Sequence, residues 1–223
     1  MTNTRESVER HSSVLLPLVY VACVLTIDTL VMQRVHWLID WTRVTWTLGD
    51  FNLLRCVTWL LVPLLWSARE FDWSYYGWRR WTRRDIALAV VLMGAAIGVI
   101  VLVPFLPGVS AYYQPHRFTS DRARWHAWKQ LALWNLGWLP GWEFMFRYFL
   151  LRRLAVRYPA AAAVFVVAAA EGAYHWNKPA LEAVAMVFFS VAASSWAVKR
   201  RNGLLPLLVH SVVEVALSVY LVI

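Results

Sequence analysis

The chain has 223 residues, of which 60% are hydrophobic and 16% are charged. Soluble domains are about half apolar and about a quarter charged, so this composition excludes an ordinary soluble protein. The net charge of +9 could suggest a nucleic-acid partner. The basic residues instead cluster between long apolar runs, as the orientation signals of membrane proteins do. We therefore expect one integral membrane domain in a lipid bilayer and no nucleic acid as partner.

The apolar runs are near the length of about 20 residues that a membrane-spanning helix needs. They predict an all-α, polytopic transmembrane helix bundle with about seven spans. The first run follows a basic start and resembles a signal peptide, but no small-residue cleavage site follows it, which favours an uncleaved span. The predicted spans are 13–32, 50–67, 85–106, 130–151, 159–176, 180–198 and 204–223.

Lysine and arginine are distributed unequally over the predicted loops. Most of them lie at the N-terminus and in the loops at about 68–84, 152–158 and 199–203. Cytoplasmic loops of membrane proteins carry such an excess of positive charge. The sequence therefore predicts a cytoplasmic N-terminus and a C-terminus on the opposite side of the membrane.

The last four predicted spans contain ionisable side chains, which are costly in lipid. An unpaired charged group at the bilayer centre costs about 2.5–3.5 kcal/mol or more, and such groups usually face a bundle interior or a water-filled cavity. They mark functional sites by default, although internal salt bridges that only serve helix packing are the alternative. The residues concerned are Glu143, Arg147, Glu171, His175, Glu182, His210 and Glu214.

The spacing of these residues predicts one shared cavity. Glu143/Arg147, Glu171/His175 and His210/Glu214 are pairs four residues apart, so each pair lies on one face of a helix. A turn at 158–159 would place Glu143 and His175 at the same depth on neighbouring antiparallel helices, because a helix rises about 1.5 Å per residue. Short connections return Glu182 and His210 to the interior of the bundle.

Pro140 and Gly141 stand just before the first of these pairs. Proline is tolerated in the first turn of a helix and disrupts what precedes it. The sequence therefore predicts a helix that begins at Pro140 within the membrane. Glu143 would then lie in its first turn, where the helix dipole favours a negative charge.

Three short motifs resemble those of a known family. "WEFMFR" (142–147), "EGAYH" (171–175) and "HSVVE" (210–214) stand in the order of EExxxR, FxxxH and HxxxN or HxxxD. These are the helical motifs of the CAAX protease and bacteriocin-processing (CPBP) family of membrane glutamic endopeptidases, which the chain resembles over roughly residues 128–220. Trp142 replaces the first glutamate, Glu171 the phenylalanine and Glu214 the last polar residue, which looks like a divergent WExxxR branch.

The resemblance implies an intramembrane endopeptidase that hydrolyses a peptide bond of a membrane-associated or lipidated protein. A carboxylate helped by a histidine would deprotonate a water, and a second histidine would stabilise the oxyanion. In this mapping Arg147 orients Glu143, which is the first candidate for the base. His175 assists the water, and His210 with Glu214 lines the oxyanion site. Residues 128–223 would form the catalytic core and residues 1–127 the N-terminal spans and loops.

Other interpretations stay open at this point. Glu171 and Glu182 are alternative bases, because Trp142 stands where the family has its usual one. For the same reason the chain could be an inactive membrane scaffold or an immunity protein. The loop 107–128 is a candidate for shaping access to the site. We expect the protein in a bacterial plasma membrane.

No cofactor is expected, with zinc as the alternative. His175, His210 and Glu214 form the kind of His₂Glu set that holds some catalytic zinc ions, which would make the chain a zinc-dependent membrane protease. The HExxH spacing is absent. A haem held between His175 and His210 is a further alternative, and their acidic neighbours argue against it.

Overall fold

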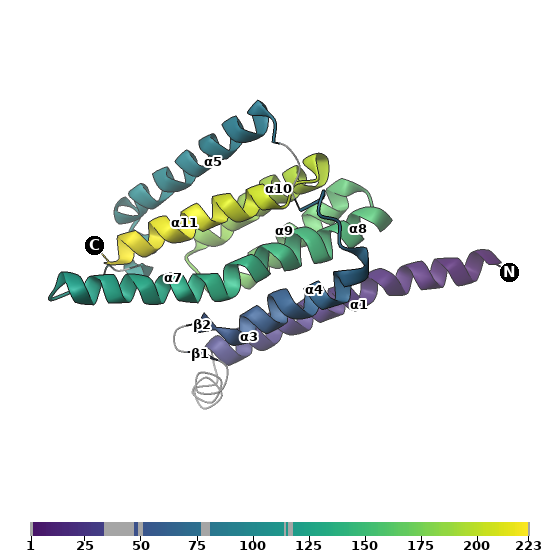
Figure 1. Ribbon diagram of the computed structural model, residues 1–223, viewed down its shortest axis with the longest axis horizontal. Coiled ribbons are helices and arrows are strands. Elements are labelled where there is room, and N and C mark those ends of the chain that lie inside the picture. Colours follow the sequence, from purple (N-terminus) through teal and green to yellow (C-terminus); the bar gives the residue numbers. More distant parts are fainter. Residues whose placement is uncertain are drawn as a thin grey trace.

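The computed structural model describes residues 2–33, 47–48, 51–76, 81–113, 115 and 118–222. These residues form a bundle of helices, with the N-terminus and the C-terminus at opposite ends (Figure 1). The outermost positions of two predicted spans, Asp50 and Ile223, lie outside the described residues, as do parts of the predicted loops at 77–80 and in 107–128.

The first three predicted spans are helical. The span at 13–32 lies within the long helix α1, and the span at 85–106 corresponds to α5 and the short turn after it. The span at 50–67 is helical from Leu53, where α3 begins, and it continues without a break through π-helical turns into α4. The bounds in this half of the chain are α1 Thr2–Gln33, α3 Leu53–Arg55, η1 Cys56–Leu61, α4 Val62–Ser67, η2 Ala68–Glu70, α5 Arg83–Leu102 and η3 Val103–Phe105.

The last four predicted spans are helical as well. The fourth lies inside a continuous helix that consists of α7, the π-helical segment η4 and α8. Breaks occur where Pro159 and Pro179 precede a helix, since proline lacks the N–H that would continue the preceding one. The bounds are α6 Pro107–Tyr112, α7 Asp121–Glu143, η4 Phe144–Leu150, α8 Leu151–Arg157, α9 Ala160–Tyr174, α10 Ala180–Arg200 and α11 Leu204–Val222.

The prediction that a helix begins at Pro140 is wrong. Helix α7 starts at Asp121 and passes through Pro140 into η4. The N–H of Phe144 reaches both the Gly141 and the Pro140 carbonyl groups, and wider π-helical turns follow. Membrane helices tolerate proline where local π-helical adjustment and neighbouring helices satisfy the freed backbone groups. Glu143 therefore lies deep in a helix and not at its N-terminus.

The all-α fold class is confirmed. Extended pairing within the described residues is limited to a two-residue hairpin and one isolated bridge between Tyr76 and Asn202. In the hairpin, β1 (Thr47–Leu48) is antiparallel to β2 (Phe51–Asn52). The hairpin leads directly into α3 and is too short to form a layer of its own.

Helix α7 packs unusually close to the second span. A Cβ added at Gly137 would lie 2.6 Å from the Asn52 backbone nitrogen, and one at Gly141 would lie 2.9 Å from the Trp59 Cβ. Small residues allow such approach between membrane helices. Elsewhere α9 packs along α10, while α11 contacts both α5 and α7 (Figure 1). The longest fully buried stretch in the described residues is 141–151, where every residue is buried.

The length and composition of several helices fit a membrane. Among the described residues, Arg83–Phe105, Ala180–Arg200 and Leu204–Val222 are long and apolar enough to cross one. Val14–Leu30, Leu53–Ser67 and Ala160–Tyr174 are shorter apolar helices. Large apolar side chains such as Val91, Phe105 and Phe188 are exposed on the outside of the bundle, where a bilayer would cover them. The protein is an integral membrane protein.

Candidate functional site

A buried guanidinium joins three helical segments at the centre of the bundle. The Arg147 side chain in η4 is 1% exposed, and its Nε lies 3.2 Å from Glu143 Oε2. Its Nη1 and Nη2 lie 2.6 and 2.9 Å from the two carboxylate oxygens of Glu171 on α9. Nη1 also donates to the hydroxyls of Ser190 and Ser194 on α10, at 3.2 and 3.0 Å. The sequence-predicted pairing of Glu143 with Arg147 is confirmed.

Glu143 also contacts His210 on α11. Its Oε1 lies 2.7 Å from His210 Nδ1, and both side chains are buried. An ionised carboxylate only accepts hydrogen bonds, so this contact requires the proton on Nδ1. The ring's Nε2 is then free to accept a proton. Nε2 lies 3.9 Å from Glu214 Oε1, which is too long for a hydrogen bond and suits a bridging water.

His175 lies at the C-terminal end of α9, beside Trp142. The two ring centroids are 5.8 Å apart, which confirms that the first two motifs lie at the same depth. His175 Nδ1 contacts the backbone carbonyl oxygen of Glu171 at 2.8 Å. His175 is thus hydrogen-bonded to Glu171 through the backbone carbonyl and not through the carboxylate. The Glu171 carboxylate faces Arg147, the stronger, charged partner.

A cavity of about 370 Å³ opens above the buried ions. His175, His210, Glu182 and Glu214 all line it, whereas Glu143, Arg147 and Glu171 lie behind its wall. Much of the remaining wall is aromatic, which gives a pocket with a few convergent polar groups. The aromatic residues lining it are Trp59, Tyr112, Tyr113, Trp134, Trp138, Trp142 and Tyr174.

Glu182 lines the cavity beside Tyr113 and Lys178. It accepts a hydrogen bond of 2.9 Å from the Tyr113 hydroxyl, which in turn accepts one of 3.0 Å from Lys178 Nζ. Burial and the Glu182 carboxylate raise the pKa of Tyr113, so its phenol stays a donor. The cavity lining thus includes Tyr112 and Tyr113 of the predicted access loop 107–128.

Sequence reasoning missed a second ion cluster that reaches the same cavity. Arg55 donates from Nε and Nη2 to the two oxygens of Asp28, at 2.8 and 2.9 Å. Tyr174, next to His175, donates to Asp28 at 2.5 Å and accepts from Arg55 at 3.1 Å. The signal was present, because Asp28 and Arg55 are ionisable residues inside the first two predicted spans.

The described part of the chain contains no group of three His, Cys, Asp or Glu side chains placed to hold a metal ion. In this conformation His175, His210 and Glu214 line one cavity without forming a ligand set. His210 has one ring nitrogen already engaged by Glu143.

The comparisons with known proteins give one match. Residues 124–216 match the family model described as "Type II CAAX prenyl endopeptidase Rce1-like". The matched region contains all seven sequence-predicted site residues, from Glu143 to Glu214, and it excludes Asp28 and Arg55. Searches among curated proteins and among solved structures give no match.

Proposed function

We propose that the protein is a membrane endopeptidase of the Rce1-like CAAX type, whose family model matches residues 124–216, and that it hydrolyses a peptide bond with a water activated by a Glu143–His210 couple. The observation that carries the proposal is the 2.7 Å contact between these side chains at the base of a polar cavity. The substrate would be the C-terminal part of a membrane-associated or lipidated protein.

His210 is the proposed general base. With its Nδ1 proton held by Glu143, its Nε2 takes the proton of a water in the cavity as the water oxygen attacks the scissile carbonyl carbon. The Glu143 carboxylate stabilises the positive charge that develops on the imidazole, in the manner of an acid–histidine pair. When the C–N bond breaks, His210 returns the proton to the leaving amine, so that the products are a carboxylate and an amine.

Glu214 and His175 are proposed to position the water. The gap of 3.9 Å between His210 Nε2 and Glu214 Oε1 leaves room for one water that bonds to both. His175 has its Nδ1 engaged by a backbone carbonyl, which leaves Nε2 as an acceptor, and it lines the same cavity. This geometry supports His175 as an assisting acceptor, as the family resemblance implies.

Arg147 and Glu171 are proposed to be positioning residues, since they lie behind the cavity wall. Arg147 holds the second oxygen of Glu143, and Glu171 holds Arg147 through two contacts. Glu143 acting alone as the base would first need to release His210. The Glu143–His210 couple needs no such rearrangement, and for that reason it is the mechanism that the geometry favours.

The test is cleavage of a lipidated reporter peptide by the purified protein in vesicles. A peptide with a prenylated C-terminal CAAX-type sequence and a fluorophore on either side of the expected cleavage site reports hydrolysis. We expect Glu143→Gln and His210→Gln to reduce kcat by about 10³–10⁴-fold, as in other acid–histidine couples. Glu182→Gln, which changes a cavity carboxylate that contacts Tyr113 and Lys178, is the matched control and should retain most of kcat.

A second candidate function is a catalytically inactive scaffold, which Trp142 favours. This side chain is 1% exposed and packs between Trp59 and Phe146, at centroid distances of 5.2 and 4.6 Å. A packing residue thus occupies the place of the family's first glutamate. If wild type and both variants leave the reporter and the membrane proteome equally unchanged, the scaffold replaces the peptidase. Loss of wild-type cleavage with a chelator would instead favour a metal-dependent mechanism.

A further inference from the structure

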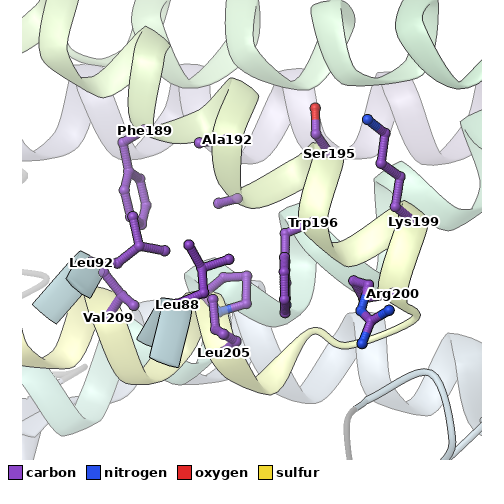
Figure 2. Close-up of a pocket in the computed structure, with 12 residues that line it drawn as sticks. Leu88, Leu92, Phe189, Ala192, Ser195, Trp196, Lys199, Arg200, Leu205 and Val209 are labelled. Carbon is purple, nitrogen blue, oxygen red and sulfur yellow. The ribbon is translucent and has the colours of Figure 1, made fainter. Parts of the chain in front are cut away.

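A second groove lies on the other side of α10 from the buried ions. It has a volume of about 330 Å³ and is lined almost entirely by apolar atoms of α5, α10 and α11. Figure 2 shows Leu88, Leu92 and Val209 on one side and the flat ring of Trp196 on the other. The part of α10 from Phe189 to Lys199 is about 15 Å long at 1.5 Å per residue. That is half of a hydrocarbon core of about 30 Å, or one leaflet.

The mouth of the groove is basic. Lys199 and Arg200 end α10 on the rim, and α5 begins beside them with Arg83 and Arg84. Arg84 lies one turn before Leu88, on the same face of α5. Asp85 accepts from Arg200 at 2.9 Å and so offsets one of these charges. Lys199 and Arg84 are exposed and form no ion pair within the described residues.

The rim also contains an aromatic ring at the level of these charges. Trp196 lies one turn before Arg200, whose guanidinium carbon is 5.6 Å from the Trp196 ring centroid. Tryptophan prefers the head-group level of a bilayer, where its ring meets both apolar chains and polar groups. The apolar floor, the aromatic rim and the cations therefore follow one another in the same order as the acyl chain, the interfacial region and the phosphate of a phospholipid.

We propose that this groove binds an anionic phospholipid of the surrounding bilayer. Its acyl chain would occupy the apolar floor between α5, α10 and α11, and its phosphate would lie between Lys199 and Arg84. Basic pockets between membrane helices on the cytoplasmic side bind acidic head groups in this way. The distribution of Lys and Arg predicts that this end of the bundle is the cytoplasmic one.

The acyl chain of the bound lipid would end next to the candidate site. Phe189 forms the inner wall of the groove, and its ring centroid lies 5.4 Å from that of His210. The guanidinium carbon of Arg147 lies 5.9 Å from the same Phe189 ring. A lipid in the groove would therefore hold the Phe189 ring against the side chains of His210 and Arg147. Binding itself does not depend on the proposed peptidase activity.

The experiment is photo-crosslinking with lipids that carry a diazirine in the acyl chain. The full chain is reconstituted with traces of labelled phosphatidylglycerol or of phosphatidylcholine with the same acyl chains, and adducts are mapped by mass spectrometry. We expect the anionic lipid to label the peptides containing Leu88, Leu92 or Val209 more strongly than the zwitterionic lipid. Removal of each cation in Lys199→Gln and Arg84→Gln should lower this labelling by about fivefold.

Two further variants make the result specific. Ala192→Trp fills the groove from an exposed position and should reduce groove labelling by both lipids. Lys129→Gln removes one exposed charge from α7, which does not line the groove, and should change nothing. Equal labelling by the two lipids, or labelling that persists in the cation variants, overturns the proposal. So does a crosslink from this groove to a second copy of the chain or to the prenyl group of a substrate peptide instead of the lipid.

Discussion

Two arginines hold carboxylates inside this bundle, and their surroundings differ. Arg147 is sealed in the core with a side chain 1% exposed, and it contacts two carboxylates and two serine hydroxyls. Arg55 is 13% exposed, lines the cavity and shares one carboxylate with Tyr174. Arg147 connects η4 with α9 and α10, whereas Arg55 connects α3 with α1 and α9.

The difference between the two surroundings shows where water lowers the free-energy cost of burying a charge. A charge in a dry core depends entirely on its partners, because nothing else replaces the lost hydration. A charge beside a water-filled cavity keeps part of that hydration when a partner is removed. We therefore expect the Arg147 cluster to dominate stability and the Arg55 cluster to adjust the shape of the cavity.

Arg147→Met should have the largest effect. It leaves Glu143 and Glu171 as buried carboxylates without a cation, and loss of one member of a buried ion cluster costs about 3–5 kcal/mol. Thermal unfolding of the purified protein in detergent measures the change. Arg147→Lys, which keeps the charge but loses the two-pronged contact with Glu171, should lie between wild type and Arg147→Met. An unfolding temperature of Arg147→Met equal to that of wild type would show that the ions do not stabilise the core.

Asp28→Asn should cost less, about 2 kcal/mol, which is typical of hydrogen bonds to a charged group. Arg55 would lose its carboxylate, but water in the cavity can solvate the guanidinium. A double-mutant cycle with Tyr174→Phe measures the coupling in the same unfolding assay. A loss of stability as large as that of Arg147→Met would contradict the distinction between an arginine in the dry core and one beside the cavity.

Gly137→Ala tests the seam between α7, which carries Glu143, and the segment that carries Arg55. The new methyl group would lie 2.6 Å from the Asn52 backbone nitrogen, so the segments must separate. Overpacking of this kind costs about 1–3 kcal/mol. Gly98→Ala is the matched control, because a Cβ there meets nothing within 4 Å and the change should be neutral. Equal unfolding temperatures for the two variants would contradict the close approach.

Asp72 provides an arginine–carboxylate contact of a different kind, with a more exposed arginine, Arg201. The Ser74 hydroxyl, with backbone N–H groups and Arg201, lowers the pKa of Asp72 from 3.8 to about 2. A carboxylate with a lowered pKa stabilises the fold above its unfolded pKa, and this contribution is lost as the pH falls from about 4 to about 2.

We expect a contribution of about 1 kcal/mol or less from this contact, because exposed ion pairs are weak. Unfolding measured between pH 5 and pH 2 should show a smaller loss of stability for Asp72→Asn than for wild type. Parallel curves for the two proteins would assign the acid sensitivity to other groups.

The site was predictable only in part. Spacing four residues apart identified Glu143 with Arg147 and placed His210 near Glu214, because a helix brings such residues to one face. Spacing did not identify the partner of Glu171, since that carboxylate turns to another helix. The link from Glu143 to His210 crosses 67 positions of sequence, and no local pattern encodes it. Asp28 and Arg55 were missed because only the last four spans were considered for ionisable residues.

The sequence by itself determined the helices, their approximate limits and the membrane environment, because hydrophobicity and proline act locally along the chain. Tertiary structure decided that the helix continues through Pro140, since neighbouring helices and π-helical turns supply what the proline lacks. It also decided which ionisable groups lie in the dry core and which line the cavity. That division depends on how the helices pack in three dimensions, and it sets the chemistry available to each group.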